Sequence, residues 1–176
     1  MQNKEIVKQI SNAAREVFST MLGVDILAGE AVIEQDTPQP ASGVVSLIGL
    51  AGAWVGTGSI SCSAETACRI SSQFLMTEYR SVNEDVLDAI AELTNMVIGS
   101  FKSTMEEQLG PMGLSIPTVV FGHNFSARTL TKNEWILVPF TCGKDRFEVH
   151  ICLAPSRKAG SRTQKPAYVH LENVIE

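Results

Sequence analysis

The segment from Asp85 to Ser103, DVLDAIAELTNMVIGSFKS, constrains the fold more than any other part of the sequence. Its apolar residues recur at intervals of three and four, which is the period of an amphipathic helix. We expect a helix over residues 82–108 that begins at the capping box SVNE of Ser81 to Glu84 and ends where LGP follows Gln108. So wide an apolar face must be buried against a second layer of structure.

The rest of the chain shows shorter helical patterns and alternating, strand-like ones. We expect two more helices, the second capped by Ser63, and six strands, the last three in meander order: helices 4–22 and 64–77; strands 30–36, 43–50, 53–62, 116–125, 134–143 and 146–154. The predicted fold class is α+β, a mostly antiparallel sheet of about six strands with two to three helices packed on it.

No linker or low-complexity segment divides the chain of 176 residues. We expect one domain over residues 1–155, followed by a polar tail over 156–176 that is loose or forms a final strand. The net charge is −5 and Lys and Arg are not clustered, which argues against nucleic acid as a partner.

The uncharged stretch from Thr37 to Ala64 is the one segment to examine for membrane insertion. Gly and Ser interrupt it too often for a spanning helix, so we expect two buried strands and no membrane contact. The polar N-terminus does not resemble a signal peptide, and the four cysteines form no CxxC pair and have no His at zinc spacing. We therefore expect a cytoplasmic protein with reduced thiols and no metal site.

The polar face of the predicted helix 82–108 is narrow and acidic. Asp88, Glu92, Asn95 and Gly99 lie within about 60° of one another on a helical wheel, and Ala91 borders them. A glycine inside a helix costs about 1 kcal/mol relative to alanine. From the pattern alone a solvated face is favoured, with two alternatives: a partner molecule lies close across the helix, or another part of this chain does.

A resemblance bears on this choice. The run AELTNMVIG, with Glu92 and Asn95 in an E-x-x-N pattern followed by Gly99, resembles the signature of the CheC/CheX/FliY chemotaxis phosphatases. VFSTMLG, VSLIGLAGAWVGTGSISCS and LSIPTVVFG resemble CheX in order and spacing, so the likeness covers roughly residues 5–155. It implies a CheX-like fold and a homodimer.

The resemblance also implies an activity, hydrolysis of the aspartyl phosphate on a phosphorylated CheY-like response regulator. Asn95 would position the attacking water, and Glu92 would pair with the regulator's lysine. Asp88, Ala91 and Gly99 would contact the partner, although Asp88 alone is better explained as a solvated residue. The regulator would supply Mg²⁺, so this chain needs no cofactor of its own. The alternatives are a non-catalytic dimeric module that docks a regulator or scaffold, and a dimeric structural protein.

A second copy of the site is a further question. A gapless shift of 83 residues aligns Gln9 with Glu92 and Asn12 with Asn95, but it places Glu16 at the position of Gly99. Gln9 cannot form a charged pair with a lysine. The match is a relict of duplication or chance, and the sequence therefore predicts a single site, as in CheX-type members of the family.

Overall fold

The computed structural model describes residues 3–35, 42–123, 125 and 134–156. Helices and strands follow one another in this order: α1 (Asn3–Val17), a π-helical turn η1 (Phe18–Leu22), β1 (Leu27–Ala28), β2 (Val32–Glu34), β3 (Ser42–Gly52), β4 (Trp54–Cys62), α2 (Ala64–Leu75), α3 (Glu84–Leu109), β5 (Met112–Leu114), β6 (Thr118–His123), β7 (Trp135–Cys142) and β8 (Asp145–Pro155). The predicted tail lies almost wholly outside the described residues, so its conformation stays a prediction.

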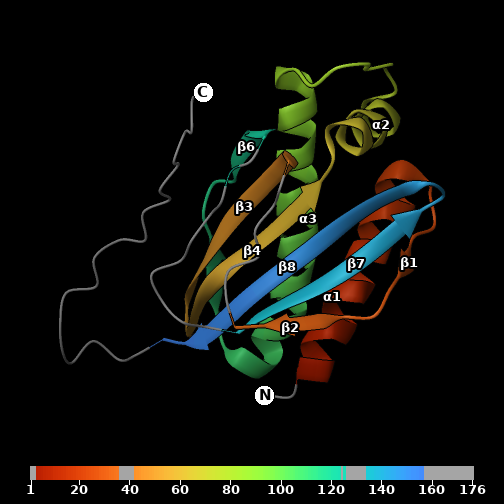
Figure 1. Cartoon of the computed structure of the whole chain (residues 1–176). Coiled ribbons are helices and arrows are strands. Elements are labelled where there is room, and N and C mark those ends of the chain that lie inside the picture. The colour runs from red at the N-terminus through yellow and green to blue at the C-terminus, as the bar shows by residue number, and fades with distance from the viewer. Residues whose placement is uncertain (1–2, 36–41, 124, 126–133, 157–176) are drawn as a thin grey trace.

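The strands form one open antiparallel sheet with the helices on one of its faces (Figure 1). The strand order is β1-β7-β8-β4-β3-β5, with β2 also paired to β7 and β6 also paired to β3. The predicted α+β class is confirmed. The described sheet has eight strands where about six were expected, because short strands form both edges and periodicity says little over two or three residues.

The order of elements repeats across the sheet. Helix α1 is followed by β1 and β2, which pair with β7, and helix α3 is followed by β5 and β6, which pair with β3. The long hairpins β3–β4 and β7–β8 then meet at the β4–β8 pair in the middle of the sheet. This pseudo-twofold arrangement supports the interpretation that the chain arose by duplication, with α1 and α3 as equivalent helices.

One residue in two on the long strands faces the helices, as the pleat of a strand requires. These residues form the core with the apolar faces of the helices: Val44, Ile48, Leu50, Ile60, Cys62, Ile136, Val138, Phe140, Phe147, Val149 and Ile151. Phe147 stacks on Phe18 at 4.7 Å between ring centroids and on Phe140 at 5.2 Å, which joins the start of η1 to the β7–β8 hairpin.

Local signals set most of the helix ends. Gly23 ends the first helix with φ 68°, and the Ser63 hydroxyl accepts a hydrogen bond from the amide of Thr66 at the start of α2. The capping box predicted at Ser81 is wrong. Asn83 is the cap of α3, because its side chain accepts a bond from the Val86 amide at 3.0 Å and Glu84 is already helical.

The meander predicted for the last three strands is wrong for β6. Strands β7 and β8 form the expected hairpin through the turn at Gly143, but β6 pairs with β3 at the other edge of the sheet. It follows α3, which lies over β3 and β4, and so it adds to the edge nearest that helix. Pairing between strands far apart in sequence leaves no local signal.

No helix within the described residues combines the length and the hydropathy needed to cross a lipid bilayer.

Candidate functional site: the outer face of α3

Helix α3 has one face in the core and one face open to solvent. Its buried residues are Val86, Ala89, Ile90, Leu93, Thr94, Val97, Ile98, Phe101 and Met105. On the opposite face Asp88 and Glu92 are exposed, while Ala91, Asn95 and Gly99 are half-buried. The structure therefore brings all five residues of the predicted site to one solvent-facing strip, about 16 Å long at 1.5 Å per residue.

The polar side chains of this strip have no partner in the part of the chain that the structure describes. Among the described residues, Asp88, Glu92 and Asn95 make no side-chain hydrogen bond and no ion pair. Neighbouring polar side chains on the same helix behave differently, since Thr94 donates to the Ile90 carbonyl and Ser100 to Glu16 of α1. The carboxylate of Glu92 and the carboxamide of Asn95 are therefore available to a partner.

No described residue packs so closely on Gly99 that it requires a glycine there. A Cβ built at Gly99 would lie 3.7 Å from Cδ1 of Leu114 in β5, which is an ordinary van der Waals contact. An alanine would fit in the described part of the chain without displacing a neighbour. The alternative in which another described segment of the same chain requires this glycine is thus not supported, which leaves a solvated face or close approach by a partner.

The C-terminal half of α3 is fastened to β5 by a group of charged contacts. Lys102 donates to the Met112 carbonyl at 3.0 Å and pairs with Glu106 at 2.9 Å, and Glu106 accepts from the Met112 amide at 2.7 Å. The Met112 amide and Lys102 lower the pKa of Glu106 from its ordinary value. Sequence reasoning missed this contact, although the spacing of four between Lys102 and Glu106 is a signal for such a pair.

The equivalent face of α1 is built differently. Asn12 is exposed, but Gln9 donates to Glu5 on its own helix at 2.6 Å. Glu16, at the position that corresponds to Gly99, accepts a hydrogen bond from Ser100 of α3. A large, engaged side chain thus occupies the place where α3 has a glycine, which favours one site over two.

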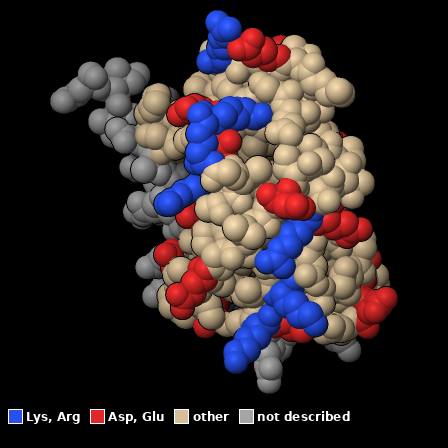
Figure 2. All heavy atoms as spheres, turned by 90° about the vertical axis from the view of Figure 1, so that its right-hand side faces the viewer, with Lys and Arg blue, Asp and Glu red and all other residues tan. Residues whose placement is uncertain are grey.

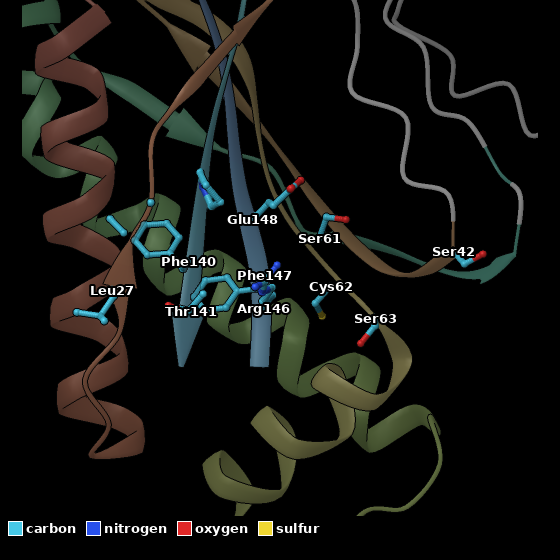
Figure 3. A pocket seen from close by; sticks show the side chains of 13 residues that line it. Leu27, Ser42, Ser61, Cys62, Ser63, Phe140, Thr141, Arg146, Phe147 and Glu148 are labelled. Carbon is cyan, nitrogen blue, oxygen red and sulfur yellow. The ribbon is translucent and has the colours of Figure 1, made fainter. Parts of the chain in front are cut away.

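The strip on α3 lines none of the three depressions described next, and Asp88 and Glu92 on it are exposed. Figure 3 shows a depression of about 560 Å³ near the end of the β7–β8 hairpin, where Ser61, Arg146 and Glu148 are among the lining residues. Two others, of about 610 and 510 Å³, adjoin α2. None of the three is lined by a residue of α3. A helix face that is not enclosed suits a macromolecular partner better than a small ligand.

The charged residues that the structure describes give no sign of a nucleic-acid site on the face seen in Figure 2 and no sign of a metal site. On the face seen in Figure 2, Lys and Arg side chains lie beside Asp and Glu side chains, and the described residues form no large patch of one sign there. Within the described part of the chain no three His, Cys, Asp or Glu side chains come together in a group that could hold a metal ion.

Comparisons with known proteins agree with this geometry. A sequence model of the family described as Chemotaxis phosphatase CheX matches residues 44–141. The CheY-P phosphatase CheX of Thermotoga maritima is 29% identical over 125 residues, which cover 70% of this chain and 80% of that protein. The match includes the region of α3.

Solved structures show the same fold. A chemotaxis protein CheX from Desulfovibrio desulfuricans superimposes with a TM-score of 0.76 and 25% identity, over 85% of this chain and 99% of that one. The CheX-CheY-BeF3-Mg²⁺ complex from Borrelia burgdorferi contains a chain that matches with a TM-score of 0.67 and 24% identity, over 84% of this chain and 96% of that one. The chain described here belongs to the CheX family of chemotaxis phosphatases.

Proposed function

We propose that this protein hydrolyses the aspartyl phosphate of a CheY-like response regulator, with the outer face of α3 laid across the regulator's active site. The observation that carries the proposal is the pair Glu92 and Asn95, which is unpartnered among the described residues of a CheX-family chain. The relative from Thermotoga maritima is named a CheY-P phosphatase, and the relative from Borrelia burgdorferi is in complex with CheY.

Asn95 is the residue that positions the water. Phosphoryl transfer needs little covalent help from the protein, so holding the nucleophile in line is the larger part of the task. The carboxamide both accepts and donates hydrogen bonds, and it adds no negative charge beside the phosphoryl oxygens. The water attacks phosphorus, the bond from phosphorus to the aspartyl oxygen breaks, and inorganic phosphate and the free carboxylate result.

Glu92 binds the regulator's lysine, one helical turn away from Asn95. A charged carboxylate is tolerated near a phosphoryl group only if a cation lies between them, and the lysine provides that cation. The Mg²⁺ belongs to the phosphorylated regulator, as part of the substrate. Helix α3 then needs no nucleophile, base or metal of its own. Because the side chains of Ala91 and Gly99 are small, the regulator can approach the backbone of α3 closely. Asp88 lies at the edge of the strip.

A second candidate function uses the same strip without catalysis. In a non-catalytic binding module, Glu92 would still pair with the regulator's lysine, while the water held by Asn95 would be irrelevant. The free side chains on α3 are compatible with either function. The two functions therefore differ in the rate of phosphate loss from the regulator and not in binding. The predicted homodimer is independent of this choice and stays a prediction.

The test measures the decay of aspartyl phosphate on a CheY-like regulator from the same organism. Wild type should accelerate decay, and Glu92→Gln should weaken binding of the regulator because it removes the charged pair. Asn95→Ala should abolish the acceleration while the complex still forms, because it removes the carboxamide that holds the water. Its matched control is Asn12→Ala, which makes the same change on an exposed asparagine of the equivalent helix α1. Asn12→Ala should accelerate hydrolysis of the aspartyl phosphate as much as wild type does. Binding without any acceleration by wild type would leave the non-catalytic module as the function.

A further inference from the structure

The loop between β5 and β6 holds a bulky apolar residue out into solvent. Ile116 is 88% exposed. The loop is fixed by Ser115, whose amide donates to the Gly49 carbonyl at 2.9 Å and whose hydroxyl accepts from the Gly49 amide at 2.8 Å. The same hydroxyl donates to the Ile116 carbonyl at 3.0 Å, and Pro117 follows. A fixed backbone that presents an isoleucine to water is an arrangement suited to binding.

Ile116 lies beside the strip on α3. Leu114, two residues earlier, is the nearest neighbour of a Cβ built at Gly99, at 3.7 Å. Two residues of extended chain span at most about 7 Å. Ile116 is therefore at the Gly99 end of the strip, on the flank of α3 that faces the β5–β6 edge.

Phe121 occupies the other end of the same flank. It is 45% exposed and pairs with Val44, a core residue, so its side chain is on the face of the sheet that carries α3. It lines a depression with Val82, just before the start of α3. Phe121 is five positions after Ile116, which in extended chain is about 16 Å, the length of the strip from Asp88 to Gly99.

The strip is too small to bind a regulator alone. A stable interface covers about 800 Å² on each partner, whereas a piece of helix about 16 Å long and about 10 Å wide projects roughly 160 Å². Neighbouring surface must contribute, and apolar side chains contribute most when they are bulky and already held in place. Other large apolar residues are exposed in the described chain, but only Ile116 and Phe121 lie on the strand edge that packs against α3.

We infer that Ile116 and Phe121 are the apolar anchors of the surface that docks the response regulator, flanking the polar strip on α3. This inference rests on the proposed function. The part of the partner that they contact is an apolar patch on the regulator next to its phosphorylation site. Asn95 then positions the water and Glu92 supplies a charged pair, while Ile116 and Phe121 supply the apolar part of the affinity.

The test compares wild type with Ile116→Ser, and uses Leu27→Ser as the matched control. Leu27 is 71% exposed on β1, at the opposite edge of the sheet. Two quantities are measured for each: the affinity for the regulator loaded with beryllium fluoride and Mg²⁺, and kcat and KM for decay of the aspartyl phosphate. Light scattering gives the oligomeric state, and thermal melting confirms that each variant folds.

Ile116→Ser should weaken binding and raise KM by about tenfold, with kcat and oligomeric state unchanged, while Leu27→Ser should match wild type. Wild-type affinity for Ile116→Ser would overturn the inference, as would a change in oligomeric state that accounts for the loss. If wild type binds the loaded regulator but does not accelerate decay, the proposed catalysis fails and the binding comparison still decides the role of Ile116. If wild type does not bind the loaded regulator, the proposed function and the inference about Ile116 and Phe121 are both overturned.

Discussion

Ile98 of α3 packs directly on Gly58 of β4. A Cβ built at Gly58 would lie 2.7 Å from Cδ1 of Ile98 and 2.8 Å from its Cγ1, closer than real Cβ contacts allow. Ile98 is fully buried, one residue before Gly99 of the strip. Gly58 thus sets how closely the middle of α3 packs on the sheet. It thereby also sets how far Asn95, on the outer face of α3, projects toward solvent.

Gly58→Ala should therefore destabilise the protein by about 1–3 kcal/mol, the usual cost of overpacking a core. Urea denaturation of the purified variant measures this change. The penalty should be smaller in an Ile98→Val background, because valine lacks the nearest atom, Cδ1. Equal penalties in the two backgrounds would show that the contact between Gly58 and Ile98 does not limit the packing of α3.

Gly99→Ala should separate stability from function. Because the structure has room for the methyl group, the substitution should raise the free energy of unfolding by up to about 1 kcal/mol through helix propensity. It should at the same time raise KM for the phosphorylated regulator, since the added methyl group holds the partner away from the helix. Ser103→Ala, exposed one turn further along, is the control that should leave KM unchanged. An unchanged KM in Gly99→Ala would mean that no partner approaches this glycine closely.

The contact of Glu106 with Lys102 and the Met112 amide should appear in the pH dependence of stability. Because these groups lower the pKa of Glu106 in the folded protein from 4.5, its contribution is fully present above the unfolded-state pKa and is lost as the pH falls through the folded-state pKa. Denaturation of wild type and Glu106→Gln at a series of pH values tests this. The difference in stability should be largest near neutral pH and shrink below about pH 4.5. A difference that is independent of pH would contradict the assignment.

Local signals in the sequence predicted the elements well, and for physical reasons. Ser63 caps α2, Gly23 ends the first helix and the turn at Gly143 closes the β7–β8 hairpin, because each depends on a few adjacent residues. The sequence predicts Ser81 as the cap of α3, whereas Asn83 forms it. Both side chains can cap a helix, and the sequence alone does not say which of the two residues adopts the extended conformation of a cap.

The arrangement of the sheet and the docking surface depended on contacts between distant segments. Pairing of β6 with β3 brings Phe121 to the flank of α3, and no periodicity in β6 indicates its partner strand. The spacing of Glu92, Asn95 and Gly99 placed them on one helix face, and their exposure agrees with that prediction. Their catalytic roles came from the resemblance to CheX and not from the spacing.

The central claim is that Asn95 acts on the water and not on binding. The most direct measurement is single-turnover decay of the regulator's aspartyl phosphate at saturating concentrations of wild type and Asn95→Ala, alongside the affinity of each for the regulator loaded with beryllium fluoride and Mg²⁺. The account predicts that Asn95→Ala binds as tightly as wild type and loses about 100-fold or more of the rate, the scale expected when a reacting group is no longer held in place. An Asn95→Ala variant that binds normally and still hydrolyses the aspartyl phosphate at the wild-type rate would contradict the account.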